Sequence, residues 1–243
     1  MDSNMNELLP NELLANELST ETLAALQAHL QETHKEDNAF VSEDFRLSQF
    51  WYDEQTGRSL AKEAIEHSSN ELKIAFVSTP AAYRDFLKIQ SEVTDNRKQA
   101  RMAENVYIFE FDRRFGAKYG ESYCFYDYNT PTSLPEKFHH FFDYVLMEPP
   151  HLSQDCLKKY SDTLRWLAKD VESVPHKKDR VVCPSAFINS KQLRKEMKAE
   201  LGFTPSGFYP GFQSKLSNHL LTYTNYKSER FGPCKEPDEE NNA

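Results

Sequence analysis

Glycine and cysteine are both scarce in this chain. Glycine supplies 7 of 243 residues, and no Gly-x-Gly follows the first predicted strand, so the glycine fingerprint of dinucleotide-binding folds is absent. The four cysteines are widely scattered, and they form no Cys-x-x-Cys pair or cysteine–histidine spacing that would indicate zinc. Most of them lie among apolar residues, which indicates buried thiols in a reducing compartment.

Basic residues and long apolar runs are also lacking. Lysine and arginine number 29 against 38 acidic residues, and the formal net charge of −9 weighs against a large nucleic-acid footprint. No apolar run approaches the length of a membrane span, and the amino terminus has no basic-then-apolar signal. We therefore expect a cytoplasmic protein with no membrane segment, and we expect it to be a monomer.

Three regions of the chain differ in composition. Residues 1–40 form a polar, acidic extension in which only one helix is expected, near residues 20–30. Residues 41–227 carry the apolar patterns of one folded domain. Residues 228–243 are expected to form an acidic, disordered tail.

Short apolar segments alternate with helical patterns throughout the domain. The predicted strands are residues 73–78, 106–112, 121–128, 141–147 and 180–183. Helices are expected after Asp53, Thr79, Ser153 and Ser190, whose side chains are suited to capping. This alternation predicts a mostly parallel sheet with right-handed crossovers, and residues 208–226 predict an antiparallel hairpin at its edge. The expected fold class is α/β, with helices on both faces of the sheet. The polar residues 91–105 show no clear period.

The most informative segment is the end of the fourth predicted strand. An apolar run from Phe142 ends abruptly in Glu148, Pro149, Pro150 and His151. Proline cannot donate to a sheet ladder, so the strand must end at Glu148, on a stiff backbone whose carbonyl acceptors stay free. An acid and free carbonyls at this end of a strand are suited to an amino group, which an aromatic ring can cover. A Pro-Pro turn in an ordinary loop would have the same sequence.

Polar residues also end the other predicted strands. Ser78 ends the first strand, Glu110 and Asp112 end the second, and Asp127 ends the third. A carboxylate after the second strand can bind both hydroxyls of a ribose, and Asp127 can accept a hydrogen bond from an adenine amino group. The helix that follows Ser78 offers unpaired N–H groups to a carboxylate. Each acid also has a plain structural interpretation, as an ion pair with a neighbouring arginine or as the start of a turn.

Taken together, these segments resemble one family. The resemblance is to the elongation factor 1-alpha lysine methyltransferase family, once described as N6-adenine DNA methyltransferases. The segments that carry it, in order, are Leu47 to Tyr52, Ile74 to Tyr83, Tyr107 to Phe115, Phe125 to Pro135 and Phe142 to Leu157. The resemblance covers roughly Phe45 to Tyr226. It implies a Rossmann-like class I methyltransferase fold, S-adenosylmethionine as methyl donor, and a lysine of elongation factor 1-alpha as acceptor.

The resemblance also assigns roles to residues. The acceptor pocket would consist of Glu148, Pro149, Pro150 and His151. The cofactor would contact Gln49, Phe50, Trp51, Tyr52, Ser78, Glu110, Asp112 and Asp127, and no metal is expected. The family usually has Asp-Pro-Pro-Tyr, so this chain departs from its pattern at Glu148 and His151.

The acceptor chemistry leaves more than one interpretation open. A lysine must lose a proton before it can be methylated, which costs about 4 to 5 kcal/mol at pH 7, whereas an adenine amino group is already neutral. The Glu-Pro-Pro-His segment suits both acceptors, and the acidic net charge together with the resemblance favours lysine. The alternatives are an N6-adenine methyltransferase, which should have a basic, aromatic-lined groove beside Pro149, and a non-catalytic relative that only binds cofactor.

Overall fold

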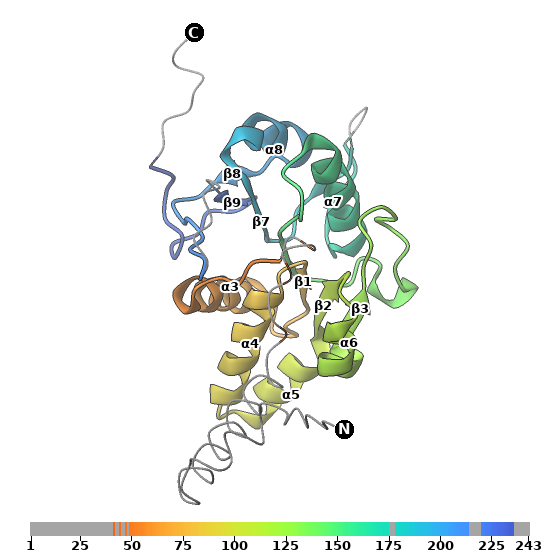
Figure 1. The fold of residues 1–243 in the computed structure, drawn as a ribbon, viewed down its shortest axis with the longest axis vertical. Helices are drawn as coiled ribbons and strands as arrows, with labels where there is room; N and C mark the ends of the chain where they lie inside the picture. Colours follow the sequence, from red (N-terminus) through yellow and green to blue (C-terminus); the bar gives the residue numbers. More distant parts are fainter. Residues whose placement is uncertain are drawn as a thin grey trace, which may run out of the picture. The chain divides into compact units, whose positions relative to one another are not determined.

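The computed structural model describes residues 41, 44, 47, 49–174, 178–213 and 220–235 (Figure 1). The chain divides into two units, Met1–Ser42 and Glu43–Ala243, and the fold described here is that of the second. Its α-helices are α3 (Glu54–His67), α4 (Pro80–Glu92), α5 (Asn96–Asn105), α6 (Arg114–Tyr119), α7 (Gln154–Leu167) and α8 (Arg194–Leu201). Its strands are β1 (Ile74–Val77), β2 (Val106–Glu110), β3 (Tyr123–Phe125), β4 (Tyr144–Met147), β5 (Val171–Glu172), β6 (Arg180–Val181), β7 (Ser185–Ser190), β8 (Thr204–Pro205) and β9 (Leu220–Thr224).

Seven of these strands form one sheet in the order β3-β2-β1-β4-β7-β9-β8. The first five in this order run parallel, with Ile74 of β1 opposite Val106 of β2 and Tyr144 of β4. Strand β9 is antiparallel to both of its neighbours. The expected parallel sheet with an antiparallel C-terminal edge is therefore confirmed. All five parallel strands end at the same edge of the sheet, which is where a ligand site belongs.

Helices cover both faces of the sheet, as expected. On one face, Ala75 and Val77 of β1 share a buried cluster with Leu157 and Leu164 of α7. On the other face, the ring of Phe76 packs against Phe86 of α4, with ring centroids 5.6 Å apart. The side chains of β1 alternate between the two layers because a strand has a period of two. Figure 1 shows α7 and α8 on one side of the strands and α3 and α4 on the other.

Local signals set where several helices begin. The Asp53 carboxylate accepts from the Thr56 amide at 2.7 Å and so caps α3, and Ser153 caps α7 through the Cys156 amide at 3.2 Å. Ser190 likewise caps the helical turn that precedes α8. Pro80 is the first residue of α4, where its missing N–H costs nothing. These starts agree with the sequence-based expectation.

The fifth strand of the sheet is not the one expected. Residues 180–181 pair with β5 in a separate two-stranded sheet, and the fifth parallel strand is β7. Strand β7 is buried along its whole length although Ser185, Asn189 and Ser190 make half of it polar. The Ser185 side chain has a local partner, because its hydroxyl donates to the Cys183 carbonyl at 3.2 Å. An apolar pattern therefore does not predict this strand.

Other boundaries differ more modestly. Residues 91–105 are mostly helical, because α4 continues to Glu92 and α5 follows. The first strand of the expected C-terminal hairpin is β8, which ends before residue 208, so the prediction for 208–226 was right only for its second strand, β9. The helix expected near residues 20–30, most of residues 1–48, and residues 214–219 and 236–243 lie outside the described residues.

The segment after residue 227 packs on the domain. Phe231 is buried, and its ring stacks on Phe208 with centroids 4.7 Å apart. Arg230 forms an ion pair with the buried carboxylate of Glu63 at 3.3 Å and another with Glu66. The disordered tail predicted for residues 228–243 therefore does not start at residue 228, since the described residues 228–235 belong to the fold. The division at residue 40 stays a prediction.

Candidate functional site

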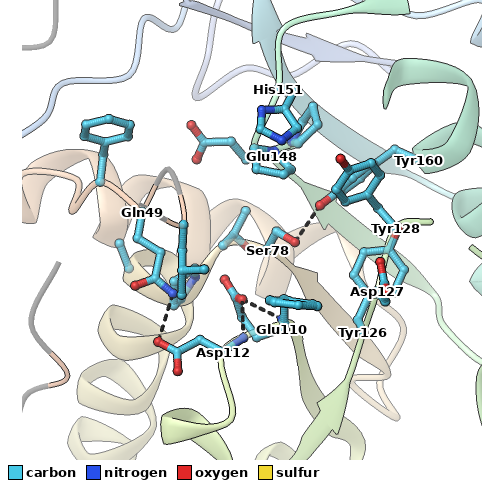
Figure 2. A pocket seen from close by; sticks show the side chains of 18 of the residues that line it. Gln49, Ser78, Glu110, Asp112, Tyr126, Asp127, Tyr128, Glu148, His151 and Tyr160 are labelled. Carbon is cyan, nitrogen blue, oxygen red and sulfur yellow. Dashed lines mark hydrogen bonds between the residues drawn. The ribbon is translucent and has the colours of Figure 1, made fainter. Parts of the chain in front are cut away.

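A cavity of about 230 Å³ opens at the carboxyl ends of β1 to β4 (Figure 2). Eleven of the twelve residues expected in the site line it: Gln49, Phe50, Tyr52, Ser78, Glu110, Asp112, Asp127, Glu148, Pro149, Pro150 and His151. In Figure 2, Glu148 and His151 lie on one side of Ser78, and Glu110 and Asp112 lie on the other. We call the side of Glu148 and His151 the acceptor end and the side of Glu110 and Asp112 the cofactor end, after the roles that the sequence predicts for these residues. Tyr52, which was predicted to contact the cofactor, instead lies against Glu148 at the acceptor end.

Trp51 is the expected site residue that does not line the cavity. Its side chain is buried, with the Arg84 guanidinium 4.9 Å from its ring and the Phe115 ring 6.5 Å away. Trp51 therefore anchors the segment before α3, and its neighbours on either side face the cavity. The prediction of a cofactor contact for Trp51 is corrected to a packing role.

The Glu-Pro-Pro segment ends β4 in the way its sequence requires. The Glu148 amide donates to the Val77 carbonyl at 3.2 Å, which extends the pairing with β1 by one residue. Pro149 and Pro150 have no N–H to donate, so the ladder ends there. Strand β4 accordingly ends at Met147.

Glu148 is half-buried, and its carboxyl accepts a hydrogen bond from the phenol of Tyr52. Burial raises the pKa of Glu148 to about 8; the Tyr52 hydrogen bond opposes this shift, and the charge of Glu110 adds to it. Burial, followed by the charge of Glu148, raises the pKa of Tyr52 well above its usual value, so the phenol keeps its proton and is the donor.

Glu110 is a second carboxyl group that the cavity holds close to neutrality. It is buried, and one of its oxygens accepts from the Phe111 amide at 2.8 Å and the Asp112 amide at 3.4 Å. Burial raises the pKa of Glu110 to about 7, although these two hydrogen bonds act against the shift. Its main contacts are thus with the turn that follows β2, whose shape it fixes.

Asp112 is the ionised acid at the cofactor end. Burial acts to raise its pKa, but hydrogen bonds from Arg114 and Gln49 outweigh it and hold the pKa below its usual value. Gln49 Nε2 lies 3.1 Å from Asp112 Oδ2, and Arg114 donates to the same carboxylate through its backbone and its guanidinium. Asp112 therefore forms the ion pair with a neighbouring arginine that the sequence allowed. Its carboxylate also faces the cavity.

The turn between β1 and α4 holds two hydroxyl groups at the cavity wall. Ser78 has φ of +53°, a left-handed conformation that is uncommon outside glycine, and its Oγ lies 2.7 Å from the hydroxyl of Tyr160. Thr79 precedes α4, but its side chain does not cap that helix. Its buried Oγ1 has no hydrogen-bond partner within the part of the chain that the structure describes. A buried hydroxyl without a partner beside a helix N-terminus fits a ligand with an anionic group.

Aromatic residues that the sequence did not single out form one wall. Tyr126 is buried and shares a hydrogen bond of 2.8 Å with Thr163, and the ring of Tyr128 lies between Tyr160 at 6.2 Å and His151 at 5.8 Å. Tyr160 comes from α7, where it is buried at helical spacing with Leu157, Leu164 and Leu167. Asp127 starts a turn by accepting from the Asn129 amide at 2.9 Å, which agrees with its plain interpretation, and it lines the cavity as well.

The charge of the cavity wall is one-sided. Glu110, Asp112, Asp127 and Glu148 line it, and no lysine or arginine is among the described lining residues. The described residues also contain no cluster of three or more acids, cysteines or histidines arranged for a metal ion. Within the same residues, no helix combines the length and apolar character that a membrane crossing requires.

This sheet order, with a ligand cavity at the strand ends and an acidic Pro-Pro segment after β4, defines a Rossmann-like methyltransferase. The chain belongs to the family described as "Probable N6-adenine methyltransferase", whose model matches residues 43–228.

Curated relatives cover most of the chain. It is 36% identical to mouse "EEF1A lysine methyltransferase 1" over 220 residues, which are 86% of this chain and 92% of that protein. It is 36% identical to the human protein of the same name over 221 residues, again 86% and 92%. It is 31% identical to "Protein-lysine N-methyltransferase EFM5" of Saccharomyces cerevisiae over 203 residues, 81% of this chain and 78% of that protein. The protein is therefore a methyltransferase, in a family whose curated relatives are named protein-lysine methyltransferases.

Proposed function

We propose that this protein is an S-adenosylmethionine-dependent protein-lysine N-methyltransferase whose acceptor is a lysine of elongation factor 1-alpha. The observation that carries the proposal is the composition of the cavity wall, which has four carboxyl groups, with Asp112 held in its ionised form, and, among the described residues, no lysine or arginine. Such a wall attracts the cationic end of a lysine. It repels the phosphates of a nucleic acid, which proteins usually bind through basic residues.

The residues at the cofactor end fit S-adenosylmethionine. Asp112 would bind the ribose hydroxyls, Asp127 would accept from the adenine amino group, and the unpartnered Thr79 hydroxyl with the start of α4 would bind the carboxylate. Asp112 and Asp127 each already accept hydrogen bonds, but a carboxylate has about four lone-pair positions and can accept more. When bound, this cofactor supplies a methyl group that a nitrogen lone pair can attack.

The acceptor end must orient an amine and keep water away from it. Glu148 and the free carbonyls that follow it can accept hydrogen bonds from the lysine nitrogen, and the rings of His151 and Tyr128 flank the entrance. Alignment of this kind contributes several kcal/mol to a displacement reaction. The acceptor protein is proposed from the relatives, since the mouse and human proteins are named for EEF1A.

The alternative acceptor is an adenine amino group, which the family description names. A nucleic-acid enzyme should have a basic, aromatic-lined groove beside Pro149. The wall there has aromatic residues, but its charged groups are acids, apart from His151. Lysine is therefore the acceptor that the site favours. The cytoplasmic location and the monomeric state stay predictions.

The test is a competition between acceptors. The full chain would be incubated with methyl-labelled S-adenosylmethionine and either elongation factor 1-alpha or adenine-containing DNA and RNA, followed by mass spectrometry of the products. We expect label on a lysine Nζ of the protein, and loss of most of that label with Glu148→Ala. Label on adenine N6 would favour the alternative, and label on neither acceptor would contradict the proposal.

A further inference from the structure

Tyr52 and Glu148 form a contact that the proposed function does not require by itself. Orienting an amine requires only a carboxylate oxygen that faces the acceptor, whereas here a buried phenol also binds Oε2 of Glu148, a residue that lines the cavity. We propose, on the basis of the proposed function, that Glu148 takes the proton from the acceptor lysine and that Tyr52 positions its carboxyl group for this step.

Tyr52 is held from two directions and is therefore a rigid support. Its backbone forms a bridge with Phe212, whose ring lies 5.3 Å from its own. The flanking residues are fixed as well, because the Gln213 amide donates to the Trp51 carbonyl at 2.9 Å and the Asp53 amide donates to the Gly211 carbonyl at 3.0 Å. A phenol held in this way fixes the oxygen that it contacts, which is the requirement for a pre-organised proton acceptor.

At Gly211, the segment around Phe212 lies very close to the start of α3. A methyl group added at Gly211 would lie 2.2 Å from Asp53 Oδ2, a distance that atoms do not adopt. Glycine at this position therefore lets the segment around Phe212 approach the start of α3 without displacing the Asp53 carboxyl group. The position of Tyr52, and with it the hydrogen bond to Glu148, thus depends on residues more than 150 positions apart in the chain.

The surroundings of Glu148 suit a proton acceptor. The titratable groups that line the cavity with it are Tyr52 before α3, Glu110 at the end of β2 and Asp112 after it, Tyr126, Asp127 and Tyr128 after β3, Tyr160 on α7, and His151 in its own segment. Burial brings the pKa of Glu148 to about 8, so its basicity approaches that of an amine and proton transfer from an ammonium costs less than it would to an ordinary carboxylate.

The step conserves charge and electrons. One N–H bond of the lysine ammonium breaks, its electron pair becomes the lone pair of the nitrogen, and the proton forms an O–H bond with the Glu148 carboxylate. An ammonium and a carboxylate become an amine and a carboxylic acid. The lone pair is then available to the methyl donor, and Glu148 later releases its proton to water, so one proton is released for each methyl group transferred.

Two substitutions should move the acid side of the pH–rate profile in opposite directions. Tyr52→Phe removes a hydrogen bond that favours the carboxylate, so the pH at which activity appears should rise. Glu110→Gln removes a negative charge that disfavours the carboxylate, so this pH should fall.

Glu148→Gln should lower kcat by roughly 10²- to 10⁴-fold, the usual contribution of a positioned base. Tyr144→Phe, which removes a phenol hydrogen bond to Tyr226 on a residue of β4 that does not line the cavity, is the matched control and should leave the profile unchanged.

The same shifts should appear without any methylation. Glutamate ¹³Cδ resonances of the cofactor-free protein, assigned with Glu148→Gln, should show Glu148 titrating at a pH that Tyr52→Phe raises and Glu110→Gln lowers. Circular dichroism and the melting temperature would establish that each variant is folded; if Tyr52→Phe is not, the titration in Glu110→Gln carries the test.

The outcomes separate this inference from the proposed function. If lysine is methylated but neither variant moves the profile or the titration, Glu148 is not the proton acceptor and the proposed function still stands. If the wild type methylates no lysine, the proposed function fails and this role fails with it, even where the titration behaves as expected.

Discussion

The guanidinium of Arg114 lies 2.7 Å from Asp112 Oδ2 at the end of β2, and the backbone amide of Arg114 donates to the other oxygen of the same carboxylate at 2.9 Å. One residue thus both neutralises Asp112 and starts helix α6 beside it. The ion pair keeps Asp112 charged and oriented while the carboxylate faces the cavity. The side chain of Asp112 thus has a structural role and also faces the cavity, where we propose that it binds the cofactor.

Asp112→Ala should weaken the binding of S-adenosylmethionine by about 10- to 100-fold, because hydrogen bonds to a charged acceptor contribute ~1.5–3 kcal/mol. Titration calorimetry of the free protein measures this directly. Arg113→Ala is the control, since Arg113 packs over Phe125 at 4.0 Å and does not line the cavity. Equal affinities for Asp112→Ala and the wild type would remove Asp112 from the cofactor site.

Thr79→Val should weaken cofactor binding without lowering the stability of the fold. Replacing a buried hydroxyl that lacks a described partner with a methyl group of similar size should leave the melting temperature unchanged or raise it. The same change should weaken S-adenosylmethionine binding by about 10-fold, since it removes a donor to the carboxylate. A clear drop in melting temperature with unchanged affinity would show that Thr79 is bonded within the protein.

Much of this site could be predicted from the sequence because its residues follow strand ends. The Pro-Pro segment, Ser78, Glu110, Asp112 and Asp127 each lie at or within a few residues of the end of a strand that its apolar run predicts, so their convergence follows from a parallel sheet. The pairing of Tyr52 with Glu148 could not be predicted, because it depends on how residues 211–213 clamp the start of α3. Tyr160 was also missed as a site residue, since helical spacing predicts a buried face but not that a phenol at its edge reaches Ser78. Strand β7 was missed because half of its buried residues are polar.

Glu148→Gln should make the protein more stable at alkaline pH. The folded-state pKa of Glu148, about 8, exceeds its ordinary value of 4.5, so the folded state favours the protonated form. This contribution to stability is complete below pH 4.5 and is lost as the pH rises through about 8. Glutamine remains neutral, so the variant and the wild type should melt together at pH 5 and diverge by pH 9. A difference of ~1 kcal/mol, a cautious value for a half-exposed group, corresponds to about 2–4 °C. Parallel melting curves across this pH range would contradict the raised pKa.

Phe231→Ala should destabilise the domain by roughly 3 kcal/mol, because Phe231 is buried against Phe208. A chain that ends at residue 227 should melt lower still, since it also loses the ion pairs of Arg230 with α3. A chain that ends at residue 235 should melt with the full-length protein, as the acidic composition beyond that point predicts. Thermal melts of the three variants would decide where the fold ends, and a lower melting temperature for the longest of them would place the boundary further along the chain.

His151→Tyr tests the departure of this chain from the Asp-Pro-Pro-Tyr pattern. His151 is exposed at the mouth of the cavity, and its ring contacts Tyr128 edge to face at 5.8 Å. A tyrosine ring has solvent into which to extend and can keep this contact, so kcat/KM for the acceptor should stay close to the wild-type value. His151→Ala removes the ring, and the acceptor KM should rise while the affinity for S-adenosylmethionine stays the same, because the ring lies at the acceptor end and not beside Asp112 (Figure 2). Steady-state kinetics with each substrate varied in turn separates the two effects. A loss of cofactor affinity in His151→Ala would show that the ring belongs to the cofactor end.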